Sequence, residues 1–182
     1  MSRMQASEIG NYLHSLVGLP LAAVNRAADM RVFEFGTLRE VAGRTIADFA
    51  LHIQCPWRLE QGSDIITGRT DLWEPAEPST SIDWVTWDYD TNANLQDAKL
   101  NEVLAGDGVP TRITKNQTDG FLVEAVAMDA FRGITITFSG SYRLVVFPAG
   151  VRGEQWRLFQ PNTEQPHLVC DNASVSLHSH AE

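Results

Sequence analysis

Residues 45–59, TIADFALHIQCPWRL, alternate between apolar and polar side chains, and this stretch decides the predicted fold. After its first residue every odd position is apolar, whereas most even positions are polar. Such alternation is typical of a strand with one buried and one solvated face, because successive side chains point to opposite faces. The register therefore predicts that Cys55 and Trp57 are buried and that His52 and Arg58 meet solvent.

A hairpin is expected to follow this strand. Gln61 and Gly62 form a plausible two-residue turn, since glycine tolerates a positive φ, and Asp64 to Trp73 would then return as the second strand. Pro56 indicates an edge position or a bulge, because proline has no backbone N–H to donate to a neighbouring strand.

Counting back from that turn gathers five polar side chains on the outer face of the hairpin. The predicted neighbours are His52 with Asp71, Gln54 with Arg69, and Arg58 with Ile65. The planar fork of arginine matches a carboxylate, so we expect this patch to bind a carboxylate or a charged side chain of a partner. The alternative is a solvated sheet face with weak cross-strand pairs.

The rest of the chain predicts two helices and a series of short strands. The helices are expected at Ser7–Val17 and at Asn94–Ala105, the second capped by Thr91 or Asn92. Beyond residue 110, turn signals separate short candidate strands at near-regular spacing, which favours antiparallel hairpins. We therefore expect one α+β domain over residues 1–182, a twisted antiparallel sheet curling into a sandwich or partial barrel with both helices packed on it. Residues 174–182 are expected to form a frayed tail.

Composition excludes several classes of partner. The chain has 23 acidic and 14 basic residues, a net charge of -9, which opposes nonspecific binding to nucleic acid or to anionic membranes. No apolar run approaches the roughly 20 residues of a membrane span. Two cysteines are too few for a disulfide framework, so we expect a soluble cytoplasmic protein.

The sequence motifs indicate no catalytic residue, metal site or cofactor. The pattern His-x-x-Cys occurs at residues 52–55 and 167–170, but residues three apart on a strand point to opposite faces and do not share a zinc ion. Residues 88–94 resemble the start of a calcium loop, yet Ala93 replaces the glycine and Lys99 the closing glutamate, so helix capping is favoured. Nucleophile elbows, phosphate loops and dinucleotide fingerprints are absent.

Five tryptophans are many for 182 residues, and core packing explains most of them. Trp73 is the exception, because it lies where the expected hairpin meets the proline-containing loop at residues 74–81. Trp84 and Trp87 follow the same loop. We therefore expect an exposed aromatic cluster there, and it is the first candidate for a protein-binding surface.

The run Ala50-Leu51-His52-Ile53-Gln54-Cys55-Pro56-Trp57-Arg58, followed by Gly68, Asp71 and a later tryptophan, resembles a family of uncharacterised bacterial proteins that share this hairpin motif. The resemblance implies a bacterial cytoplasmic protein. It carries over no catalytic or binding residue.

These observations favour a non-enzymatic protein-binding or adaptor module, such as an immunity-type protein whose acidic surface meets a basic protein. The predicted binding residues are His52, Gln54, Arg58, Arg69, Asp71 and Trp73. The alternative is a small-ligand-binding protein or hydrolase with a pocket between sheet and helices, using His52, Asp71 and the neighbouring arginines.

Overall fold

The fold is seen in a computed structural model, which describes residues 3–78, 82–90, 93–104, 112–114, 121–172 and 174–179. For residues 3–6 and 112–114 it describes the backbone only.

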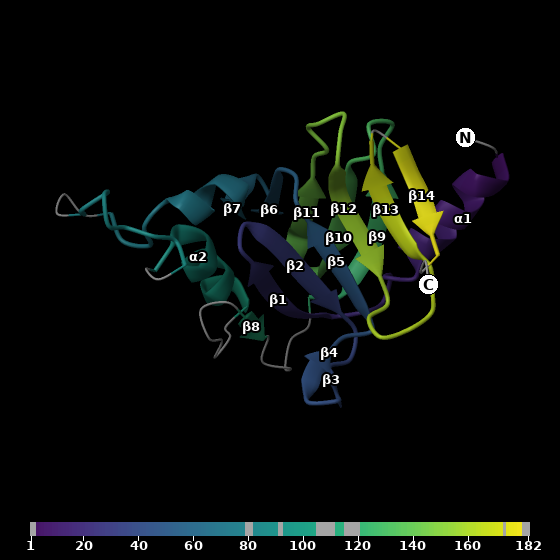
Figure 1. The fold of residues 1–182 in the computed structure, drawn as a ribbon, viewed down its shortest axis with the longest axis horizontal. Coiled ribbons are helices and arrows are strands. Elements are labelled where there is room, and N and C mark those ends of the chain that lie inside the picture. The colour runs from purple at the N-terminus through teal and green to yellow at the C-terminus, as the bar shows by residue number, and fades with distance from the viewer. Residues whose placement is uncertain are drawn as a thin grey trace.

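Two antiparallel sheets pack face to face and form a sandwich (Figure 1). In spatial order, the seven-stranded sheet consists of β14 (Ser174–His178), β13 (His167–Asp171), β12 (Glu154–Phe159), β5 (Phe49–Ile53), β2 (Met30–Phe35), β1 (Leu21–Ala27) and β8 (Arg112–Thr114). The five-stranded sheet consists of β7 (Asp64–Gly68), β6 (Trp57–Gln61), β11 (Tyr142–Val146), β10 (Ile134–Phe138) and β9 (Val123–Met128).

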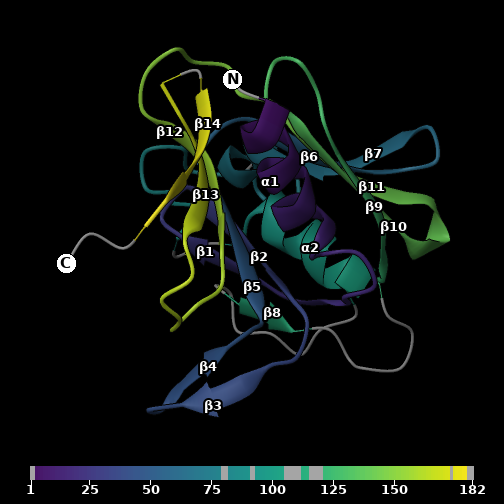
Figure 2. The ribbon, with the colours of Figure 1, turned by 90° about the vertical axis from the view of Figure 1, so that its right-hand side faces the viewer.

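The two helices close opposite sides of the sandwich, at the left and right of Figure 1, so one lies in front of the other in Figure 2. Helix α1 (Arg3–His14) packs against the edge strands β14 and β9, and helix α2 (Leu95–Leu104) packs against β7 and β8. A small hairpin of β3 (Arg39–Val41) and β4 (Arg44–Ile46) projects from the body. The predicted α+β class, dominated by antiparallel strands with two packed helices, is confirmed.

The core lies between the sheets and is held by large aromatic side chains from both. Phe33 of β2 meets the Trp57 ring edge-on at a centroid distance of 5.4 Å, and Phe35 stacks on Phe138 at 6.4 Å. Trp156 is fully buried, and its Nε1 donates a hydrogen bond to the Arg132 carbonyl at 2.9 Å. Dispersion and burial of these rings stabilise the packing of one sheet on the other.

The odd positions of residues 47–59 are buried as predicted, but the even positions are not all solvated, since Ala50 is 3% exposed and His52 is half-buried. The stretch is also not one strand. Cys55 and Trp57 are each only 3% exposed, as the register predicts. However, the chain passes from the seven-stranded sheet at β5 to the five-stranded sheet at β6. The crossing occurs at Pro56, which has no N–H for a ladder, while the N–H groups of Gln54 and Cys55 both donate to the Gln155 carbonyl.

The hairpin turn lies one residue later than predicted. Gln61 pairs with Asp64, so Gly62 and Ser63 form the turn, and Gly62 has a φ of 60°. A bulge after Leu59 shifts the register again. Strand β7 ends at Gly68, and the residues expected to continue it form the 3-10 helix η1 (Arg69–Trp73).

These shifts make the predicted cross-strand neighbours wrong. His52 lies opposite Val32 and Arg157, and Arg58 lies opposite Gly68 and Val145. A local count from one turn is wrong here because β5 and β6 belong to different sheets, so β7 pairs with β6 and not with β5.

The ends of several elements also differ from expectation. Helix α1 begins at Arg3 and ends at His14, whereas the sequence predicts Ser7–Val17. The Asn94 side chain accepts a hydrogen bond from the Asp97 N–H at 2.8 Å, and the expected caps Thr91 and Asn92 lie outside the described residues. Residues 174–178, expected in a frayed tail, pair with β13 as strand β14.

Because Leu51 is fully buried between the sheets, replacing it should destabilise the whole domain. We expect Leu51→Ala to lower the free energy of unfolding by about 2–5 kcal/mol, the usual loss for a buried leucine. Urea denaturation followed by tryptophan fluorescence measures it. Ile65→Ala, at a side chain that is 65% exposed, is the matched control and should change the free energy little; equal losses would contradict the sandwich core described above.

Candidate functional site

Acidic and aromatic side chains concentrate in residues 70–98, called here the acidic aromatic segment. It holds seven of the 23 acidic residues and none of the 14 basic ones. The other 16 acidic residues nearly balance the basic ones, so most of the net charge of -9 comes from this segment. Its aromatic residues are Trp73, Trp84, Trp87 and Tyr89.

Part of the segment projects from the α2 side of the sandwich (Figure 1). Several of its apolar side chains are exposed. Trp73 is 47% exposed, Trp84 61% and Val85 93%. Beside them lies a hollow of about 390 Å³ lined by Glu74, Pro75, Ala76, Pro78, Ile82, Trp84 and Leu95. We call these exposed side chains and the hollow the acidic aromatic surface.

Local hydrogen bonds set the shape of the exposed turn. Asp83 Oδ1 accepts from the Val85 N–H at 3.0 Å, and the Asp83 carbonyl accepts from the Trp87 N–H at 2.9 Å. This turn brings the centroids of the Trp84 and Trp87 rings to within 6.0 Å of each other. At the base of the segment the Leu95 N–H donates to the Glu74 carbonyl at 2.8 Å, which joins its two ends.

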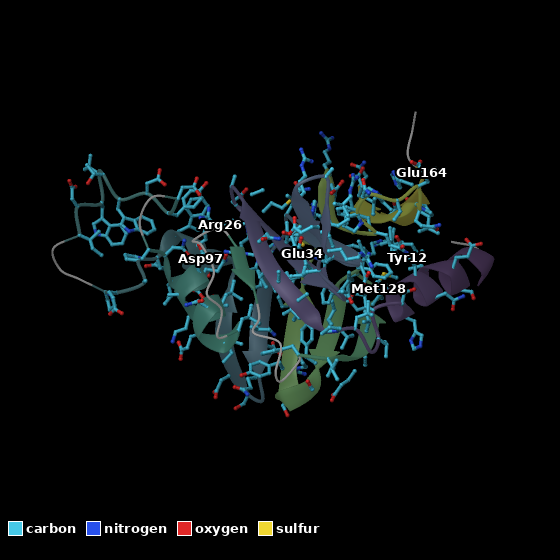
Figure 3. All side chains as sticks on the ribbon, turned by 90° about the horizontal axis from the view of Figure 1, so that it is seen from below. Tyr12, Arg26, Glu34, Asp97, Met128 and Glu164 are labelled. Carbon is cyan, nitrogen blue, oxygen red and sulfur yellow. The ribbon has the colours of Figure 1, made fainter. Side chains whose placement is uncertain are left out.

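A buried cluster of charges fixes α2, and with it the segment, to the sandwich (Figure 3). Arg26 and Arg31 lie directly opposite each other on β1 and β2, and they are 8% and 1% exposed. Asp97 in the first turn of α2 contacts both: its Oδ1 is 2.7 Å from Arg31 Nη2 and its Oδ2 is 3.4 Å from Arg26 Nε. Burial lowers the pKa of Arg31, and the Asp97 carboxylate opposes that shift.

One of these arginines, Arg26, also reaches the exposed part of the segment. Arg26 Nη1 donates to the Asp90 carboxylate, and the guanidinium carbon lies 5.3 Å from the centre of the Tyr89 ring. Tyr89 in turn meets Trp73 edge-on at 4.6 Å. A continuous series of contacts therefore links buried Arg26 to an exposed tryptophan.

Gln96 ties this cluster to η1. Its side-chain oxygen accepts a hydrogen bond from Arg31, and its Nε2 donates to the Gly68 carbonyl at 2.8 Å. The sequence holds one signal for this cluster that the motif search missed: Arg31 shares the buried register of Phe33 and Phe35 on β2.

The predicted binding residues fall into separate surroundings. His52 meets the Phe159 ring edge-on at 4.8 Å on the outer face of the seven-stranded sheet. Gln54 Nε2 donates to Glu154 at 3.2 Å, and the Gln54 carbonyl accepts from Arg69 Nη1 at 2.5 Å. Gln54 and Arg69 are thus in contact, although through the backbone of Gln54.

The remaining predicted residues lie elsewhere. Arg58 is on the five-stranded sheet, where it pairs with Glu60 and lies 4.7 Å from the centre of the Phe147 ring. Asp71 Oδ2 accepts from the Gly68 N–H at 3.0 Å and holds the start of η1. Of the six predicted binding residues, Trp73 is the one that belongs to the acidic aromatic surface.

The cysteines sit in the interior. Desolvation raises the pKa of Cys55 to about 12 and that of Cys170 to about 11, which disfavours the reactive thiolate. In the described part of the chain, no group of three or more His, Cys, Asp and Glu side chains is arranged to hold a metal ion. None of the described helices is long and apolar enough to cross a membrane.

Comparison with known proteins gave no match: no family model, curated protein or solved structure resembles the chain significantly.

Removing the shared carboxylate should destabilise the protein strongly. In Asp97→Asn the two buried arginines lose their common counter-charge, and we expect a loss of about 3–5 kcal/mol in the free energy of unfolding. Chemical denaturation measures it. Glu102→Gln, which breaks the exposed Lys99–Glu102 pair on the same helix, is the control and should cost less than about 1 kcal/mol. A similar loss in both variants would refute the role given to Asp97.

His52 should make stability depend on pH. Burial lowers the pKa of His52 in the folded state, so the unfolded chain binds the proton more readily. Stability is therefore lost as pH falls through the unfolded pKa near 6.5. We expect the free energy of unfolding of the wild type to fall between about pH 7.5 and 5.5 more steeply than that of His52→Asn. The exposed His178→Asn variant is the control; a slope unchanged by His52→Asn would disprove the assignment.

Proposed function

We propose that the chain is a non-enzymatic protein-binding module that acts in the cytoplasm and binds a basic protein through the acidic aromatic surface. The observation that carries this proposal is the exposure of Trp73, Trp84 and Val85 within a segment that has no basic residue. Asp90 and Asp97 of this segment pair with the buried arginines, whereas Glu74, Glu77 and Asp83 lie outside that cluster.

Both features have a defined physical role in association. Large aromatic side chains are the residues that most often supply binding energy at the centre of an interface. Carboxylates around them attract a basic partner over a distance of about one Debye length and repel acidic ones. An immunity-type protein that covers a basic partner fits this combination.

The hollow favours an interface in which a side chain of the partner is buried, in addition to electrostatic attraction. Pro75, Pro78 and Ile82 give it apolar walls, and Glu74 supplies one carboxylate. An aliphatic or aromatic side chain of the partner fits such a hollow, while a neighbouring lysine or arginine reaches the acidic residues.

The alternative of a ligand-binding or hydrolytic pocket has weaker support. It needs His52 and Asp71 to converge, but His52 contacts Phe159 on the seven-stranded sheet and Asp71 holds the start of η1. Glu154, whose charge acts on His52, is already engaged, because both of its carboxylate oxygens interact with Arg157.

Photo-crosslinking captures the partner at the surface that it contacts. A benzophenone amino acid replaces Val85, which is 93% exposed on the acidic aromatic surface, or Ile65, which is 65% exposed on β7. We expect a protein from the organism's own extract to crosslink at position 85 and not at position 65.

The protein so identified is then purified and titrated against the variants. Trp84→Ala should weaken binding roughly 30-fold, the effect of losing a central residue worth about 2 kcal/mol. Phe131 is another exposed aromatic side chain, and it lies outside this surface. Phe131→Ala is therefore the matched control and should bind the crosslinked protein like the wild type. Equal affinity of the wild type and Trp84→Ala would refute the proposed function.

A further inference from the structure

The three tryptophans of the acidic aromatic segment carry hydrogen-bond donors that the protein itself does not use. Trp156 in the core donates its Nε1–H to the Arg132 carbonyl. By contrast, the indole N–H groups of Trp73, Trp84 and Trp87 donate to none of the described residues. Since an indole nitrogen donates and does not accept, a partner that covers these rings has to bring acceptors to them.

The backbone around the hollow has few donors left for a partner. Pro75 and Pro78 have no N–H, and the Ala76 N–H already donates within the segment, to a carbonyl oxygen 2.9 Å away. In the exposed turn, the N–H groups of residues 85–87 all donate to Asp83. A strand of a partner therefore finds few N–H groups here with which to pair.

Flat apolar faces surround the hollow. Pro75, Pro78 and Ile82 line it together with Trp84, and the Trp87 ring lies next to that of Trp84, with the two planes tilted by 57°. Flat apolar groups of a partner pack well on such faces, because the area of contact is large. A proline ring has this shape, and it brings no N–H that would need an acceptor.

The hollow also presents a carboxylate without a counter-charge. Glu74 is exposed, and within the described part of the chain its carboxylate forms neither an ion pair nor a hydrogen bond. Lys99 on α2 pairs with Glu102 at 2.8 Å, which raises the pKa of Lys99, and Glu77 adds a smaller rise. Glu74 is therefore available to a basic side chain of a partner.

We propose that the acidic aromatic surface binds a proline-rich segment of its partner, held in the polyproline II conformation and flanked by lysine or arginine. This inference rests on the proposed function and names the part of the basic protein that is bound. Proline rings enter the hollow and pack on Trp84, and backbone carbonyls accept hydrogen bonds from the indole N–H groups of Trp84 and Trp87. A flanking basic side chain pairs with Glu74.

The polyproline II helix is the partner element that meets all of these requirements. It has no internal hydrogen bonds, so its carbonyls are free to accept from indole N–H groups. In an α-helix the carbonyls are used within the helix, and an added strand needs backbone N–H groups that are already engaged here. Prolines also hold the segment in its bound shape beforehand, which lowers the entropic cost of binding.

A synthetic peptide tests the inference by NMR titration. The probe is a capped peptide with a run of prolines between pairs of lysines, added to isotope-labelled protein in about 50 mM NaCl. We expect saturable binding with a Kd below about 1 mM. The Nε1–H signals of Trp84 and Trp87 should shift, while that of fully buried Trp156 stays in place. A titration that moves neither the Trp84 nor the Trp87 signal would overturn the inference.

Two matched peptides separate the effect of conformation from that of charge. In one, alanine replaces every proline and the lysines stay; in the other, glutamate replaces every lysine. Each should bind at least about tenfold more weakly than the probe, because the first loses the preformed conformation and the second is repelled by the carboxylates of the segment. Equal binding of the alanine peptide would show recognition of charge alone and would contradict the inference.

Single variants assign the contacts. Trp84→Phe keeps an aromatic ring but loses the N–H, so it should bind the probe about threefold more weakly or worse. Glu74→Gln should weaken binding about twofold and reduce its dependence on salt. Phe131→Ala, at an exposed ring outside this surface, is the control and should bind like the wild type. Wild-type affinity in either Trp84→Phe or Glu74→Gln would count against the proposed contacts and overturn the inference.

The outcomes separate this inference from the proposed function. A basic protein that crosslinks at position 85 and is weakened by Trp84→Ala, but whose crosslinked segment contains no run of prolines, would overturn the inference and still support the proposed function. If Trp84→Ala changes the binding of neither the probe nor any crosslinked protein, both proposals fail.

Discussion

A single carboxylate, that of Asp97, contacts two arginines that face each other inside the protein, and Asp90 gives Arg26 a second counter-charge. Arg26 and Arg31 are cross-strand neighbours on β1 and β2, a position in which like charges repel. Burial removes the water that would otherwise screen them. The hairpin therefore tolerates this pair because α2 brings Asp97 between the two guanidinium groups, and this requirement fixes where α2 begins.

The charged cluster orients the acidic aromatic segment more than it stabilises the fold. Nε and Nη2 of Arg26 and Nε of Arg31 are buried and donate no hydrogen bond, which costs free energy that apolar side chains would not. What the cluster provides is orientation, since Arg26 also contacts Asp90 and Tyr89 of the acidic aromatic segment. The apolar sandwich supplies stability, and the charged cluster sets how the segment is presented.

Much of the architecture could be predicted from local patterns. Alternation over residues 45–59 predicted which side chains are buried, and the proline-containing loop with its tryptophans predicted the exposed surface around Trp84. The patch built on His52 and Asp71 could not be predicted, because its assembly depends on which strands become neighbours. One of the two partners of β5 is β12, about a hundred residues away, and no local pattern encodes that pairing. The burial of Arg31 could not be predicted from its own strand, because its counter-charge, Asp97, lies on the distant helix α2.

The central claim is that the buried arginines hold the acidic aromatic segment on the sandwich. Amide hydrogen exchange of the wild type and of Arg26→Gln tests it most directly. Faster exchange confined to residues 82–90 and the start of α2, with β5 and β10 unchanged, is the predicted result. Exchange that is equal in both proteins, or that increases evenly over all strands, would contradict the claim.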